Sequence, residues 1–158
     1  LSCRLQPLSP SWKEEFIQMH RNVYEVYKAQ SNGDEIHQIL QKSFSGEALT
    51  QEYIEHFSTL AKMEFEETAI DVKKIDYHNI KILEYTKIHL RVDADWSVGG
   101  IVTHQKHKHP RVNRYRAAYT LQQNDARSWR ITQTRMRNME RVQRATLSDE
   151  DFFELVSL

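Results

Sequence analysis

The segment that decides the fold is IHLRVDADWSV at residues 88–98, where apolar and polar residues alternate without a break. Successive side chains of a β-strand point to opposite faces of the sheet. The alternation therefore predicts a strand with one buried and one wet face. The even positions, Trp96 among them, form the buried face. Gly99 and Gly100 follow and permit a bulge or kink before the strand continues to His104.

Further strands are predicted on both sides of this segment. Residues 113–121 alternate in the same way, and Pro110 marks the turn that precedes them. The dipeptide at 124–125 forms a short hairpin loop, after which Trp129 opens a last strand that runs to about Met139 or Val142. Two shorter strand-like segments lie upstream, at residues 70–72 and 80–82.

The N-terminal half has helical periodicity instead. Apolar residues recur at steps of three and four from Trp12 to Tyr27, and Ser11 with Glu14 has the spacing of a capping box. A second helix starts at Asp34. A third runs over residues 47–61, with its apolar positions on the buried side: Leu49, Tyr53, Ile54, Phe57 and Leu60. The order of helices and strands predicts an α+β fold.

Length and composition favour one domain over residues 1–158, with 1–10 and 145–158 as terminal extensions. The single cysteine, Cys3, excludes an internal disulfide framework and a multi-cysteine metal site. The charge is uneven although the formal net charge is zero. Residues 86–144 carry 13 basic against 4 acidic residues, whereas residues 1–85 carry 9 against 14. The predicted sheet is therefore basic.

Three helices followed by long strands with a Gly-Gly break resemble the nuclear transport factor 2-like (ketosteroid isomerase-like) superfamily. The strand YRAAYTL at 115–121 and the following WRI at 129–131 are similar to the paired last strands of that fold. The resemblance implies three N-terminal helices packed on a bent, mainly antiparallel sheet, which is a cone-shaped, cystatin-like architecture with a pocket.

A narrower likeness concerns WSVGGIVTH at 96–104 together with the spacing of residues 40–53. This pattern is similar to uncharacterised bacterial domains that lie beside a membrane anchor and outside the cytoplasm. It implies a periplasmic, membrane-associated protein. Because the chain starts at Leu1, we expect an anchoring segment upstream, and Cys3 is either a lipid-carrying residue at that junction or a free thiol.

Three histidines, His104, His107 and His109, lie within six residues, and neutral imidazoles bind zinc or copper well. Convergence on one ion requires the chain to turn between them, and the charges of Lys106 and Lys108 oppose a bound cation. The alternative is an exposed basic hairpin edge with His104 hydrogen-bonded in the interior. Beyond zinc or copper, no cofactor is expected.

A ligand pocket is the second candidate site. The buried strand faces should combine aromatic side chains with a few polar groups, which is the usual form of a ligand site. The alternative is that these polar groups pair with one another or lie beyond the pocket rim. The predicted lining is Trp96, Asn113, Tyr115, Tyr119, Gln133 and Arg135.

Catalysis has weaker support, because the inward strand face offers no carboxylate as general base. By alternation Asp93 and Asp95 fall on the solvent face, which leaves His104 with Tyr115 as the only acid–base candidates. A site for an isomerase or dehydratase in the pocket is therefore an alternative, and a non-catalytic protein is favoured.

Arginines on the wet face indicate an anionic partner. Arg114 and Arg116 share a face, and Arg130 is expected to join them from the adjacent strand. Without interleaved exposed aromatics they do not form a nucleic-acid stacking platform, so the anionic partner is expected to be a protein, lipid headgroups or the chain's own acidic tail. The alternative is a solvated arginine face that binds no partner. The leading hypothesis is a non-catalytic ligand-binding or assembly module that forms homodimers through its sheet. Zinc or copper binding and a pocket enzyme are the alternatives.

Overall fold

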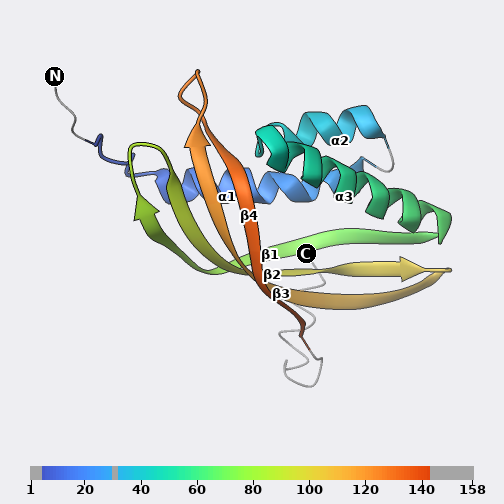
Figure 1. Cartoon of the computed structure of the whole chain (residues 1–158). Coiled ribbons are helices and arrows are strands. Elements are labelled where there is room, and N and C mark those ends of the chain that lie inside the picture. Colours follow the sequence, from blue (N-terminus) through green and yellow to red (C-terminus); the bar gives the residue numbers. More distant parts are fainter. Residues whose placement is uncertain (1–4, 30–31, 143–158) are drawn as a thin grey trace.

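The computed structural model describes residues 5–29 and 32–142. Helical segments come first: α1 (Trp12–Asn22), the 3-10 segment η1 (Val23–Lys28), α2 (Gly33–Leu40) and α3 (Gly46–Phe65). Four strands follow: β1 (Thr68–Tyr85), β2 (Leu90–His104), β3 (His107–Gln123) and β4 (Trp129–Arg141). They form one antiparallel sheet in the order β1-β2-β3-β4, which confirms the predicted α+β class (Figure 1).

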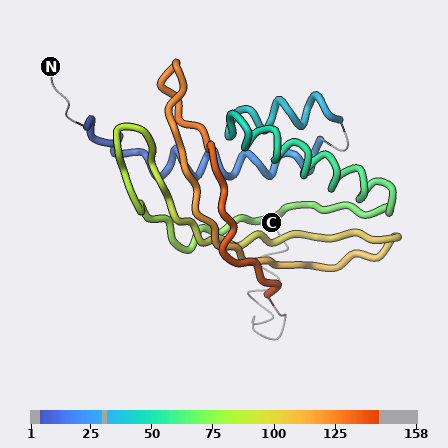
Figure 2. Tube along the Cα trace, viewed as in Figure 1, coloured from blue at the N-terminus to red at the C-terminus, as the bar shows by residue number. Residues whose placement is uncertain are grey.

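The sheet is sharply bent, and the helices lie on its concave side (Figures 1 and 2). Register shifts in β1, between Val72 and Lys74 among other places, insert extra residues opposite β2. Bulges of this kind increase twist and bend a strand. The extra residues interrupt the alternation of apolar and polar side chains. The sequence therefore predicts two short segments, at 70–72 and 80–82, where the structure has the single long strand β1.

Burial follows the alternation of β2. Leu90, Val92, Ala94 and Trp96 are all buried, and they pack with the inward residues of β3 and with the helices. The main apolar cluster is drawn from every layer: Phe16, Val26, Ile36, Leu40, Phe44, Leu60, Ile80, Tyr119, Leu121 and Ile131. This cluster fixes the helices against the concave face. In the part of the chain described, no helix combines the length and the apolar character that crossing a membrane requires.

The helices differ from the sequence prediction at three points. The first helix is α-helical only to Asn22 and continues as a 3-10 helix. Ser11 precedes α1 without capping it, because its Oγ pairs with that of Ser9 at 2.8 Å, so the predicted capping box is wrong. On α3, Ile54 is 57% exposed and Phe57 38%, so their predicted burial is wrong. Only part of the apolar stripe of α3 meets a neighbouring element.

Candidate functional site

A groove lies between α3 and the concave face of the sheet. It is part of an open hollow of about 1300 Å³ that extends past β4 to outer-face residues such as Thr120 and Gln133. Its floor is aromatic, with Trp96 and Tyr115 stacked at 5.4 Å between ring centroids and Tyr24 stacked on Tyr27 at 6.4 Å. The indole Nε1 of Trp96 donates a hydrogen bond of 2.8 Å to the hydroxyl of Tyr24. The rings therefore form one continuous, hydrogen-bonded surface from η1 to β3.

Beneath this floor His20 joins α1 to the sheet. Its Nδ1 lies 2.8 Å from the hydroxyl of Tyr77 and its Nε2 lies 2.9 Å from that of Tyr119. Burial lowers the pKa of His20 to about 3, so the ring is neutral at physiological pH. A neutral imidazole has one donor and one acceptor nitrogen, so one tyrosine hydroxyl accepts and the other donates. Both ring nitrogens are occupied, which leaves His20 no free nitrogen for a substrate.

Carboxylates from α3 form the wall of the groove. Glu52 and Glu55 lie on the same helix face, and the Glu52 carboxylate pairs with the His56 ring at 3.0 Å. Burial raises the pKa of Tyr27, and the negative charge of Glu55 raises it further. Burial also raises the pKa of Tyr119, with a smaller contribution from the charge of Glu52. The carboxylates therefore act electrostatically on the floor hydroxyls. Among the described residues, the α3 side of the groove carries no lysine or arginine.

Strand β4 forms the remaining border. Met136 and Met139 are 53% and 66% exposed, and the register places them opposite Ala117 and Tyr115 on the concave face. Thr134 lies opposite Tyr119, and its buried Oγ1 has no hydrogen-bond partner in the described part of the chain. This border is apolar and adaptable, because methionine side chains are flexible and polarisable.

The predicted pocket residues divide into two groups. Trp96, Tyr115 and Tyr119 do line the groove, whereas Asn113 donates to the hydroxyl of Tyr115 at 3.1 Å and does not. Gln133 and Arg135 border the groove but stand opposite Thr120 and Ala118, on the outer face of the sheet.

The prediction that Gln133 and Arg135 share the face of Tyr119 is wrong. The cause is a register shift between Thr120 and Leu121, where β4 contains one extra residue, Thr132. One inserted residue moves every later side chain to the opposite face, because the side-chain period of a strand is two.

The histidine cluster lies at an exposed hairpin tip. The turn falls at Gln105 and Lys106, which have φ values of 47° and 71°, and not at Pro110, which is part of β3. His104 stands opposite His107, and all three histidines are exposed, so the predicted interior position of His104 is wrong. Within residues 5–29 and 32–142, no three His, Cys, Asp or Glu side chains are grouped so that they could hold a metal ion.

The outer face of the sheet carries an ion-pair network. Arg114 binds Asp95 through two hydrogen bonds of 2.9 Å, and this bond is the main cause that lowers the pKa of Asp95. Asp93 is on the predicted outer face but only 4% exposed, with Arg116 at 3.7 Å and Arg137 at 3.6 Å. These arginines therefore sit partly neutralised by carboxylates of the same sheet.

The third arginine predicted for this face behaves differently. Arg130 stands opposite Gln122 and donates from Nε to the carbonyl oxygen of Gln41 at 3.1 Å. Its guanidinium thus ties β4 to the end of α2 and is directed away from the network of Arg114 and Arg116.

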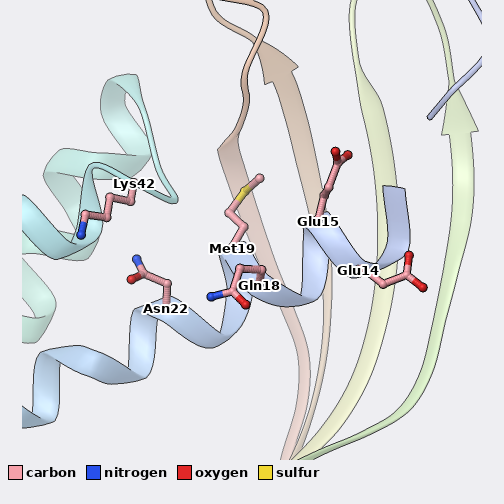
Figure 3. A pocket seen from close by; sticks show the side chains of 6 residues that line it. All are labelled: Glu14, Glu15, Gln18, Met19, Asn22 and Lys42. Atoms are coloured by element: carbon pink, nitrogen blue, oxygen red, sulfur yellow. The ribbon is translucent and has the colours of Figure 1, made fainter. Parts of the chain in front are cut away.

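A second hollow lies beside α1, lined by Glu14, Glu15, Gln18, Met19, Asn22 and Lys42. Its charged groups do not converge: the carboxylates of Glu14 and Glu15 point in different directions, and the amine of Lys42 points away from both (Figure 3). A shallow hollow without convergent polar groups lacks the usual features of a ligand site.

Four residues of the site were not predicted from the sequence: His20, Tyr24, Glu52 and Glu55. A signal for the first two was present, because Phe16, His20 and Tyr24 follow each other at steps of four on one helix face. The carboxylates gave no comparable signal, since acidic residues at helical spacing are typical of a solvated helix surface. Cys3 and the acidic segment 145–158 lie outside the described residues. No protein-family model and no curated protein matches this chain.

Proposed function

We propose that this domain is a non-catalytic binding module and that its site is the groove between α3 and the sheet. The observation that carries the proposal is the pairing of an aromatic floor with the carboxylates of Glu52 and Glu55. Aromatic faces attract cations, and carboxylates beside them add to that attraction. The groove therefore suits a positively charged ligand with an apolar body.

The arrangement of proton-transfer groups favours binding over catalysis. Both nitrogens of His20 are engaged, and burial raises the pKa of Tyr119 well above its usual value. Glu52 is paired with His56. A general base needs a lone pair that is free to reach substrate; the hydrogen bonds of His20 occupy its acceptor nitrogen, and Tyr119 holds its proton too tightly to act as a base.

A titration with benzyltrimethylammonium tests the site. We expect saturable binding that shifts the amide resonances of residues around Tyr115 and Glu55, whereas benzenesulfonate, a matched anion, should not bind. Replacing Glu52→Gln and Glu55→Gln together should weaken the cation about tenfold at low salt. The matched control is Glu14→Gln with Glu15→Gln on α1, which removes the same charge outside the groove. Equal binding of cation and anion would contradict the proposal.

Association through the sheet is the second part of the proposal. The outer face presents carboxylates and guanidiniums side by side, as in the pairs Arg114–Asp95 and Arg116–Asp93. Both signs of charge on one face permit a self-complementary contact between two copies. We expect a light-scattering mass of twice 18.8 kDa. The Arg135→Glu variant should shift the equilibrium toward monomer, and a strictly monomeric wild type at high concentration would contradict the contact.

Family and location are proposed on resemblance. The order of helices and bent sheet supports membership of the nuclear transport factor 2-like superfamily. The likeness around residues 96–104 supports an extracytoplasmic, membrane-associated position. Recovery of the native protein in the cytosolic fraction of the cells that produce it would contradict that position.

A further inference from the structure

We propose that the natural occupant of the groove is an extended, basic peptide that pairs with the free edge of β4 as an added strand. This inference rests on the proposed function, because it uses the same groove and names the class of ligand and its mode of docking. Three features carry it: the open edge of β4, the two different sides of that edge, and the charge of the groove.

The first feature is the edge itself. β4 is the last strand in the sheet order, so one of its edges pairs with β3 and the other faces away from the sheet. The start of that edge is already paired: Ser45 N–H donates to the carbonyl of Ile131 at 3.1 Å, and Ile131 N–H donates to the carbonyl of Ser43 at 2.8 Å. Beyond this short parallel bridge, over residues 133–141, the described chain places no strand beside β4. Unpaired edges of this kind bind extended peptides through main-chain hydrogen bonds.

The length of the pairing segment follows from the bulges. Register shifts mark extra residues at Thr132 and Arg137, where the regular ladder is interrupted. Bulges blunt an edge, so they limit continuous pairing. The uninterrupted stretch between them is residues 133–136, and a peptide therefore pairs with about four residues of β4.

The second feature is the contrast between the two sides of β4. Its concave side carries Thr134 and Met136 and faces the groove, while its outer side carries Gln133 and Arg135. Alternate side chains of an added strand would point to these two sides. Basic side chains are suited to the concave side, where the α3 carboxylates lie, and are disfavoured beside Arg135. The edge therefore selects a peptide that alternates basic and uncharged residues.

The third feature is charge. Three glutamates of α3 border the groove, Glu47, Glu52 and Glu55. The two arginines that also border it, Arg91 and Arg135, stand opposite Thr120 and Ala118 on the outer face of the sheet, so the negative charge is concentrated on the concave side. The chain's own residues 145–158 carry four acidic side chains and no basic one, so their charge is wrong for this groove.

The test uses three blocked seven-residue peptides and the full chain. The first alternates lysine and valine, the second is the same sequence with every backbone nitrogen methylated, and the third replaces each lysine by glutamate. N-Methylation keeps the charge and the side chains but removes the backbone donors that an added strand needs. We expect the lysine–valine peptide to bind, the N-methylated peptide to bind at least tenfold more weakly, and the glutamate peptide not to bind. Isothermal titration at low salt measures all three.

Matched variants locate the contact. Replacing Glu52→Gln and Glu55→Gln should weaken the lysine–valine peptide by about tenfold, while the Glu14→Gln, Glu15→Gln control, which removes the same two charges outside the groove, should bind as wild type does. Equal affinity for the lysine–valine peptide and its N-methylated form would overturn strand addition and leave the cation-binding groove intact. Failure of every peptide, with benzyltrimethylammonium still bound, would also overturn this inference alone. If neither the peptides nor benzyltrimethylammonium bind, the proposed function is contradicted as well.

Discussion

Replacing His20 with alanine is expected to lower the free energy of unfolding by roughly 3–5 kcal/mol, one of the largest effects for a single residue of this chain. The ring is 4% exposed and packs edge-on against Trp96 at 4.3 Å. Its removal leaves a cavity and two tyrosine hydroxyls, those of Tyr77 and Tyr119, without their partner. Urea unfolding measures the loss, and His107→Ala, at the exposed hairpin tip, is the control that should change stability little.

The same residue makes stability depend on pH. Burial lowers the pKa of His20 from about 6.5 to about 3, so between these values the unfolded chain binds a proton that the folded chain does not. The stabilisation is complete above pH 6.5 and is lost as the pH falls toward 3. The expected slope is about 1.4 kcal/mol per pH unit. Comparing wild type with His20→Gln at pH 7 and pH 5 isolates this slope, and an equal pH dependence of both proteins would contradict it.

The second large effect is expected at Gly100, where alanine should destabilise the fold by about 2–3 kcal/mol. Gly100 stands opposite Val72 beside a bulge of β1, and a Cβ there would lie 2.5 Å from the carbonyl oxygen of Asp71. Because that atom belongs to the backbone, the strands themselves must separate. Thr103→Ala, in the same strand pair, is the control. Wild-type stability of Gly100→Ala would show that β1 does not approach β2 so closely.

The β2 strand shows what the sequence can predict. Its alternation placed Leu90, Val92, Ala94 and Trp96 on one face, and all four are buried. The pattern was reliable because a strand packed on one side against helices needs apolar residues only on that side. Asp93 obeys the same alternation yet is buried, since the neighbouring Arg116 and Arg137 side chains cover it.

Strand β4 shows where alternation fails. Regular alternation from Ile131 would place Gln133 and Arg135 on the concave face. The extra residue Thr132 forms a bulge that moves both to the outer face. A bulge changes hydrogen bonding between two strands, and the sequence of one strand alone does not specify it. The sequence also misplaces the β2–β3 turn. It predicts the turn at Pro110, because proline is common in turns, but the turn falls at Gln105 and Lys106, which adopt positive φ although neither is a glycine.

Only the part of the candidate site that the strands contribute to its floor was predictable. Trp96, Tyr115 and Tyr119 were assigned to one surface from strand alternation, and they meet there. The opposing wall depends on how α3 crosses the sheet, which is set by tertiary packing and not by local spacing. Glu52 and Glu55 have the spacing of an ordinary solvated helix face, and only the position of α3 beside the tyrosines brings them to the groove.

The most direct test of the groove is amide chemical-shift mapping of the labelled protein during titration with the alternating lysine–valine peptide. The proposal predicts that the largest shifts fall on residues 133–136 of β4 and on α3 around Glu52 and Glu55, with the outer-face Asp95 and Arg114 unchanged. Intermolecular contacts between peptide amides and β4 should accompany them. Shifts confined to the outer face, or no shifts at peptide concentrations that saturate calorimetric binding, would contradict the assignment of the groove as the binding site.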